Sequence, residues 1–114
     1  MVKLKPILPT LKEKKRYLVY EVLSERKIEL DLSREIVKKT TTLLGIFDSA
    51  KAGIQSVEYD KKHQRGVLRV TVKEVDKLKT TLALINQLND EEITIRTLGV
   101  SGILKKAKNK YIAG

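Results

Sequence analysis

Apolar and polar residues alternate along residues 16–24, RYLVYEVLS, with the period of two that is typical of a β-strand. The segment is rich in aromatic and branched side chains, which pleated strands favour. Leu18, Tyr20 and Val22 alternate with Tyr17, Val19 and Glu21. Because both sets contain apolar side chains, the pattern predicts an inner strand that is buried on both faces at its centre.

From residue 31 onward the apolar period lengthens to that of a helix. Asp31 or Ser33 is a suitable N-cap, and Glu35 lies near the positive end of the expected helix. Residues at helical spacing follow: Ile36, Thr40, Leu43, Leu44 and Phe47. Gly45 either ends this helix or kinks it into a second helical piece, IFDSAKAG, which Gly53 closes.

Two further alternating segments, IQSVEYD and VLRVTVK, flank the polar stretch KKHQRG at residues 61–66, and together they predict a β-hairpin. A second apolar stripe at helical spacing comes next: Val75, Leu78, Leu82, Ile85 and Leu88. The stretch LNDEE ends that helix before a last strand, ITIRTL, at residues 93–98. Ser101 can then cap a terminal helix that extends through Tyr111.

The expected order is therefore strand, helix, strand, strand, helix, strand and terminal helix. This order predicts an α+β fold of the ferredoxin-like (split βαβ) type. We expect a four-stranded antiparallel sheet with two main helices on one face and an additional C-terminal helix.

The composition limits the possible classes of protein. A chain of 114 residues is one domain by size, and we expect a domain over residues 16–114 preceded by an extended basic arm over residues 1–15. The sequence has no cysteine, which excludes disulfides and thiolate metal sites. No apolar run approaches membrane-spanning length, so we predict a cytoplasmic protein without membrane contact.

The net charge of +10 is concentrated at the two ends of the chain. Residues 1–16 contain six basic and one acidic residue, residues 96–114 contain five basic and none acidic, and residues 17–95 contain thirteen of each. This distribution is typical of a neutral globule with two segments that bind a polyanion, although a solubilising surface would give it too. A C-terminal segment without any carboxylate favours nucleic acid.

The sequence matches known catalytic motifs poorly. Ser101 is followed at once by Gly102, so the spacing of a nucleophile elbow fails, and the only histidine, His63, falls on the predicted hairpin tip. Gly99 and Gly102 are too close together for a P-loop. The consecutive acids at residues 90–92 are more typical of a solvated loop than of a metal site. An acylphosphatase-like enzyme would need an arginine and an asparagine such as Arg65 and Asn86, but nothing in their spacing singles them out.

A phosphate-binding role remains for the segment that begins GVSG. Its glycines let the chain leave the last strand sharply, and the amide groups at the start of the next helix carry partial positive charge. The predicted RNA-binding residues are Gly99, Ser101, Gly102, Lys105, Lys106, Lys108 and Lys110, together with Lys12, Lys14 and Lys15 from the basic arm and Arg16 at the start of the domain. A plain serine-capped surface helix is the alternative explanation. Since Tyr17 and Tyr20 lie on opposite faces of their strand, base stacking on the sheet is disfavoured and structured RNA is the expected ligand.

Three segments carry a resemblance to a known family. LPTLKEKKRYLVYEV at residues 8–22, TTLLGIFDSAKAG at residues 41–53 and RTLGVSGILKKA at residues 96–107 resemble archaeal ribonuclease P protein component two, the Pop-five family. The resemblance covers nearly the whole chain in the same order. One departure is Ile103, where a threonine often follows the glycine, so a hydroxyl contact is not expected there.

The resemblance implies a noncatalytic subunit of the ribonucleoprotein that removes 5′ leaders from precursor tRNA. The RNA would hold the active site and its magnesium ions, and the protein itself would bind no cofactor. The resemblance also implies a TIM-barrel-like partner subunit and a heterotetramer. Ile46 and Phe47 are the candidate protein-interface residues, although core packing is the role we favour for Phe47. A basic ferredoxin-like protein-interaction module without a role in RNA processing is the alternative function.

Overall fold

A computed structural model describes residues 14–112 of the chain. Its helices and strands are β1 (Lys15–Ser24), α2 (Ser33–Ala52), β2 (Gln55–Asp60), β3 (Arg65–Thr71), α3 (Val75–Leu84), β4 (Gln87–Leu88), β5 (Glu91–Ser101) and α4 (Leu104–Ala107). A 3₁₀ turn at Val72–Glu74 precedes α3, and a π-helical turn at Lys108–Ile112 follows α4. No helix within residues 14–112 is long and apolar enough to cross a membrane.

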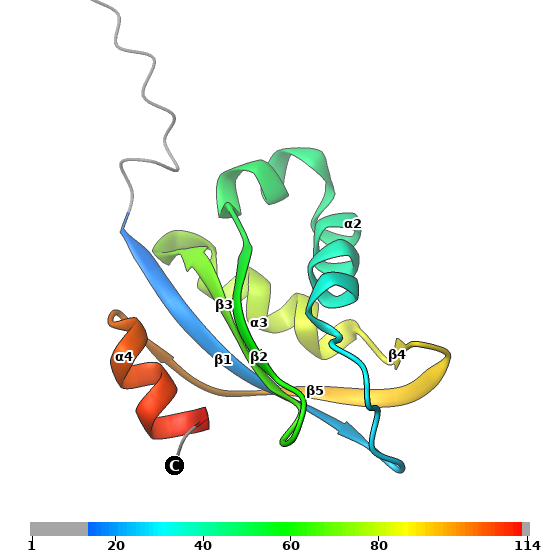
Figure 1. Cartoon of the computed structure of the whole chain (residues 1–114). Coiled ribbons are helices and arrows are strands. Elements are labelled where there is room, and N and C mark those ends of the chain that lie inside the picture. Colours follow the sequence, from blue (N-terminus) through cyan, green and yellow to red (C-terminus); the bar gives the residue numbers. More distant parts are fainter. Residues whose placement is uncertain (1–13, 113–114) are drawn as a thin grey trace, which may run out of the picture.

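The strands form one antiparallel sheet in the order β2-β3-β1-β5-β4 (Figure 1). The inner position predicted for the first strand is confirmed, since β1 pairs with β3 on one side and β5 on the other. The α+β class and the antiparallel sheet are also confirmed. The predicted number of four strands is wrong, because the short strand β4 pairs with the beginning of β5 as a fifth.

One face of the sheet carries the larger core, under α2 and α3. Leu18, Tyr20 and Val22 of β1 are buried there against Ile36 of α2 and Leu78 of α3. The opposite face is covered over part of its area by α4, which Figure 1 shows on the side of the sheet away from α2 and α3. The predicted arrangement of two main helices on one face is therefore correct.

The kink that Gly45 predicts is present, with a left-handed backbone at φ 83° inside α2. Gly53 ends the helix in the left-handed region, and its N–H donates to the carbonyl of Ser49 over 3.1 Å. The prediction that Phe47 packs in the core is wrong, because its side chain is 83% exposed in the helical piece beyond the kink. The N-cap position falls on Leu32, while the Asp31 carboxylate accepts the N–H of Ser33 over 2.9 Å.

The second main helix is shorter than its apolar stripe suggests. α3 ends at Leu84, so Ile85 and Leu88 are buried outside the helix, and Leu88 belongs to β4. A strand residue and a helix residue can both point into one core, which is why an apolar stripe alone does not locate the end of the helix.

Candidate nucleic-acid interface

Strand pairing brings the two basic ends of the domain together. Tyr17 near the start of β1 lies opposite Ser101 at the end of β5, because the two strands are antiparallel. Figure 1 shows the start of β1 and the start of α4 at the same end of the sheet. A Cβ added at Gly102 would lie 3.5 Å from Nη1 of Arg16. Two segments separated by most of the sequence therefore form one basic surface.

The basic residues just before and at the start of β1 are anchored to the sheet to different degrees. Lys14 is exposed, and its carbonyl accepts the N–H of Val72 over 2.9 Å. The ammonium group of Lys15 donates to Oγ1 of Thr71 over 3.1 Å. Nη1 of Arg16 donates to the carbonyl of Lys15 over 3.0 Å. The remaining residue predicted in the arm, Lys12, lies outside the described residues.

Gly99 has a packing role that its sequence motif does not reveal. It is a residue of β5 rather than of a turn, and its φ does not lie in the left-handed region. A Cβ at this position would lie 2.2 Å from Cζ of Tyr111, closer than any real Cβ contact. Gly99 is therefore required so that the ring of Tyr111 can rest on the strand. The predicted sharp exit from the strand at Gly99 is wrong, since β5 continues to Ser101.

The start of the last helix differs from the prediction. Ile103, not Ser101, occupies the N-cap position of α4, and no side chain caps the helix. The hydroxyl of Ser101 instead accepts the N–H of Ile103 over 3.1 Å in the connecting turn. α4 has only four residues and is continued by the π-helical turn at Lys108–Ile112, and four lysines lie on this segment. A full side-chain charge exceeds the roughly half charge at the end of a helix, so the lysine side chains supply most of the positive field.

Those lysines are not equivalent. Lys105 and Lys106 are exposed on α4. Nζ of Lys108 lies 3.3 Å from a carboxylate oxygen of Glu58, so part of its charge is neutralised. Lys110 is exposed, and its Nζ lies 5.3 Å from the centre of the neighbouring Tyr111 ring. Lys105, Lys106 and Lys110 are therefore the strongest candidates for contacts with phosphate.

The C-terminal helical segment covers the middle of the sheet face on which it lies. Ala107 is fully buried against Val19 and Val67, and Leu104 and Tyr111 pack around them. The prediction that Tyr17 and Tyr20 lie on opposite faces is confirmed, since Tyr20 belongs to the core under α2 and α3. Bases therefore have no open platform of aromatic side chains on these central strands.

One charged cluster on the same face escaped the sequence analysis. The carboxylate of Glu21 in β1 accepts a hydrogen bond from Nε of Arg65 in β3 over 2.9 Å. It also binds Arg96 in β5 through Nε at 2.9 Å and Nη2 at 2.7 Å. Glu21 on β1 is the direct cross-strand partner of Arg65 on β3 and of Arg96 on β5. Only the register of the long-range pairing places them together, and the sequence alone gives no signal for it.

The electrostatics of this cluster act mainly on Glu21. Desolvation by burial raises the pKa of its carboxyl group, but hydrogen bonds from Arg65 and then Arg96 outweigh that effect, and the net pKa lies below the ordinary value of 4.5. Glu21 is therefore ionised at neutral pH. Nη1 of Arg65 also donates to the carbonyl of Tyr111 over 3.0 Å, which ties the C-terminal segment to β3.

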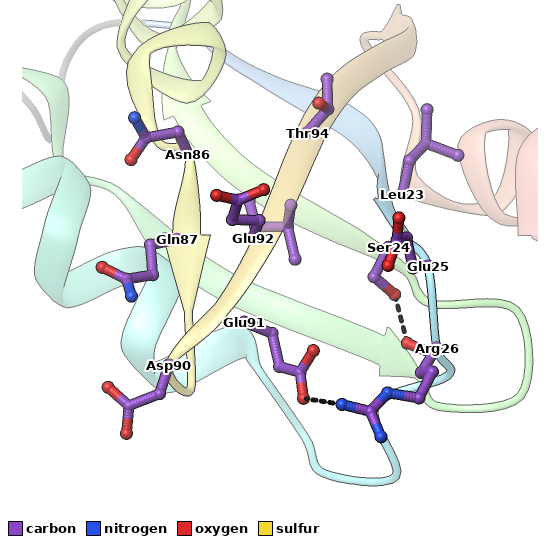
Figure 2. A pocket seen from close by; sticks show the side chains of 11 residues that line it. Leu23, Ser24, Glu25, Arg26, Asn86, Gln87, Asp90, Glu91, Glu92 and Thr94 are labelled. Carbon is purple, nitrogen blue, oxygen red and sulfur yellow. Dashed lines mark hydrogen bonds and ion pairs between the residues drawn. The ribbon is translucent and has the colours of Figure 1, made fainter.

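The opposite end of β5 carries negative charge. Figure 2 shows an open hollow between the end of β1 and the β4–β5 hairpin, with the carboxylates of Glu25, Asp90, Glu91 and Glu92 around it. A single arginine, Arg26, lines this hollow, and its Nη2 lies 3.9 Å from Glu91. The strand thus runs from an acidic end to a basic end, and a polyanion is attracted only to the latter.

The enzymatic alternatives are not supported by the geometry. Arg65 lies on β3 and Asn86 just before β4, and β1 and β5 separate these two strands. Three strand spacings amount to roughly 14 Å, too far for the two side chains to act on one substrate. His63 in the β2–β3 turn binds the carboxylate of Asp60 at 2.7 Å, at the end of the sheet opposite Ser101. Within residues 14–112, no group of three or more His, Cys, Asp or Glu side chains could hold a metal ion.

The helical piece beyond the kink in α2 exposes large apolar side chains. Ile46 is 82% exposed and Phe47 is 83% exposed, and Leu43 before the kink is 52% exposed. Apolar side chains gathered in this way are typical of a surface that another protein covers. The structure therefore places both predicted interface residues at the surface, on the side of the sheet away from α4.

Comparisons with known sequences identify one family, and a comparison with solved structures finds the same fold. Residues 16–112 match the Rpp14/Pop5 family. The chain is 38% identical to ribonuclease P protein component 2 of Thermococcus gammatolerans over 92% of this chain and 88% of that protein. It is 33% identical to the same component of Pyrococcus horikoshii over 99% of this chain and 95% of that protein. A chain in the cryo-EM structure of yeast ribonuclease MRP shares the fold, with a TM-score of 0.61, 14% identity and coverage of 79% of this chain and 75% of that chain.

Proposed function

The chain belongs to the Rpp14/Pop5 family, and on that premise we propose that it is a noncatalytic protein subunit of ribonuclease P, the ribonucleoprotein that removes 5′ leaders from precursor tRNA. The observation that carries the proposal is the match to archaeal ribonuclease P protein component 2 over nearly the full length of both chains. The alternative, a basic protein-interaction module without a role in RNA processing, is not favoured.

The protein acts through charge and shape rather than through chemistry of its own. Lys14, Lys15 and Arg16 at the start of β1 lie beside the basic segment that follows β5, so both contact the same stretch of ribonuclease P RNA. Cations placed where RNA strands approach one another reduce the repulsion between phosphates. The RNA then folds at a lower magnesium concentration. The magnesium ions of the reaction belong to the RNA, and the protein needs no cofactor.

A second protein subunit covers the apolar surface of Ile46 and Phe47. The support is the exposure of both side chains on the helical piece beyond Gly45, on the face of the sheet away from α4. A partner bound there leaves the basic surface free for RNA. We propose the TIM-barrel-like subunit of ribonuclease P as this partner, in a heterotetramer that functions in the cytoplasm and acts on precursor tRNA.

The fold is of the ferredoxin-like type with one added strand. The support is the order of the four longer strands in the sheet, β2-β3-β1-β5. Along the chain, α2 follows β1 and α3 follows β3. This is the arrangement of a split βαβ unit. The two-residue strand β4 extends the sheet only at its edge.

The test is cleavage of precursor tRNA by ribonuclease P RNA together with the partner subunit, with and without this protein, across a magnesium titration. The protein should lower the magnesium requirement. Replacement of Lys105, Lys106 and Lys110 by glutamine should raise the requirement again, because three cations near the phosphates are lost. Arg34→Gln, on the face of the sheet away from α4, is the control. If the protein has no effect in the presence of folded, bound partner, the proposal is wrong.

A further inference from the structure

The cluster of Glu21, Arg65 and Arg96 contains more positive charge than its own structure requires. Two guanidinium groups bind one carboxylate, which leaves a net charge of +1 on the open part of the sheet face. One arginine with a bidentate contact would already neutralise Glu21. The second positive charge is available to an anion from outside the protein.

Arg96 is the member of the cluster that can reach such an anion. Its side chain is 59% exposed, whereas those of Arg65 and Glu21 are 27% and 10% exposed. Nε and Nη2 of Arg96 are fixed by Glu21, so the guanidinium plane has a defined orientation. Within residues 14–112 its Nη1 group donates to no acceptor. A guanidinium held along one edge presents its other edge to a phosphate in the geometry that bidentate binding needs.

The surroundings of Arg96 favour a continuous anionic ligand. Arg65 binds the carbonyl of Tyr111, so the cluster lies directly beside the end of the C-terminal segment that carries Lys110. In the other direction along the same face come Thr94 and then Glu92, which borders the acidic hollow in Figure 2. An anion at Arg96 can therefore extend toward the lysines but is repelled at the acidic end.

We infer that Arg96, oriented by Glu21 and supported by Arg65, binds a phosphate of the RNA backbone and extends the RNA-binding surface from α4 onto the open sheet face. The inference rests on the proposed function, because it assumes RNA on the neighbouring lysines. It adds a contact on the sheet face, ahead of the predicted RNA-binding residues 99–110. RNA is favoured over an acidic protein segment because the cluster is continuous with those lysines, which the proposed function assigns to the RNA backbone.

The first experiment measures binding of the full-length protein to ribonuclease P RNA as a function of KCl concentration at fixed magnesium. Arg96→Gln should weaken binding roughly 3- to 10-fold and reduce the log–log salt slope by about 0.7–0.9, the effect of one lost phosphate contact. Arg26→Gln is the matched control, since Arg26 is also an exposed arginine paired with a glutamate, but at the acidic end. It should change neither the affinity nor the slope. The Lys105→Gln/Lys106→Gln double variant tests the proposed function in parallel.

The outcomes separate the two ideas. If the lysine variant binds more weakly while Arg96→Gln binds like the wild type, the inference is wrong and the proposed function stands. If neither variant weakens binding, both are wrong. Equal losses for Arg96→Gln and Arg26→Gln would indicate only an effect of net charge and would also overturn the inference. Thermal unfolding of each variant shows whether the fold is retained.

A second experiment leaves the cluster intact and so does not depend on the stability of an arginine variant. The chain has no cysteine, so Thr94→Cys introduces a unique attachment point for a hydroxyl-radical-generating iron chelate next to Arg96. We expect RNA cleavage from Thr94→Cys and from Asn109→Cys in the C-terminal segment, and none from Ala83→Cys on α3. Cleavage from Asn109→Cys but not from Thr94→Cys would contradict the inference.

Discussion

Two glycines on the sheet each lie beneath a tyrosine, one on each face. A Cβ at Gly66 would lie 2.3 Å from the hydroxyl oxygen of Tyr20, and a Cβ at Gly99 would lie 2.2 Å from Cζ of Tyr111. The contacts are equally close, but their surroundings differ. Tyr20 is fully buried in the middle of β1, whereas Tyr111 is partly exposed near the end of the chain.

The difference shows how the two faces divide their roles. The face under α2 and α3 has a large core and holds the domain together. Among residues 14–112, the core on the face under α4 has three fully buried residues, Val19, Val67 and Ala107, and this face holds the basic segment in position for a ligand. Damage to the first face should therefore unfold the protein, and damage to the second should mainly release the C-terminal segment.

The largest expected effect is that of Gly66→Ala. The added methyl group meets a tyrosine side chain that has no room to move, so we expect a loss of roughly 2–3 kcal/mol in the free energy of unfolding. Urea unfolding monitored by circular dichroism measures it. A change below about 0.5 kcal/mol would show that the core around Tyr20 adapts, contrary to the comparison.

Gly99→Ala should have a smaller effect on global stability, about 1 kcal/mol or less, because Tyr111 can be displaced together with the chain end. Amide hydrogen exchange should show lost protection in residues 104–112 while β1 and β3 stay protected. Gly102→Ala is the matched control, since its nearest neighbour would be Nη1 of Arg16 at an ordinary 3.5 Å. Loss of protection throughout the sheet would mean that α4 is not separable from the rest of the domain.

Glu21 links the two arginines on the second face and makes stability depend on pH. Its pKa is lower in the folded state than in the unfolded state, so its contribution is present above the ordinary value of 4.5 and is lost as the pH falls below it. Glu21→Gln should cost roughly 1–2 kcal/mol at pH 7, since Arg96 is well exposed. The variant should also lose less stability than the wild type between pH 5 and pH 3. Glu29→Gln, on an exposed glutamate, should behave like the wild type.

The smallest expected effect on stability belongs to the apolar surface beyond Gly45. Phe47→Ser should change the free energy of unfolding by less than about 0.5 kcal/mol, because the side chain is almost fully exposed. The same substitution should abolish assembly with the partner subunit in light scattering coupled to size-exclusion chromatography. Leu84→Ser, at a leucine that is 64% exposed on α3, is the control. Unchanged assembly of Phe47→Ser would exclude this surface as the interface.

Local sequence patterns were sufficient for most of the elements. The alternation in residues 16–24 gave an inner strand, the polar stretch at residues 61–66 gave the hairpin turn, and Gly45 and Gly53 marked a kink and a helix end. These predictions succeeded because period, turn chemistry and left-handed glycines act within a few residues of one another. The edge strand β4 was missed because two residues carry no period.

The sequence by itself determined the charge distribution, the predicted elements and the family, since these depend on residue types and their local order. Only the tertiary structure decided which contacts those residues make. Antiparallel pairing of β1 with β5 joined the two basic ends, and its register placed Glu21 between Arg65 and Arg96. The same packing set Tyr111 on Gly99 and left Phe47 in solvent. Contacts between distant segments depend on register and on the direction in which a helix leaves its kink, and neither is encoded within a short window of sequence.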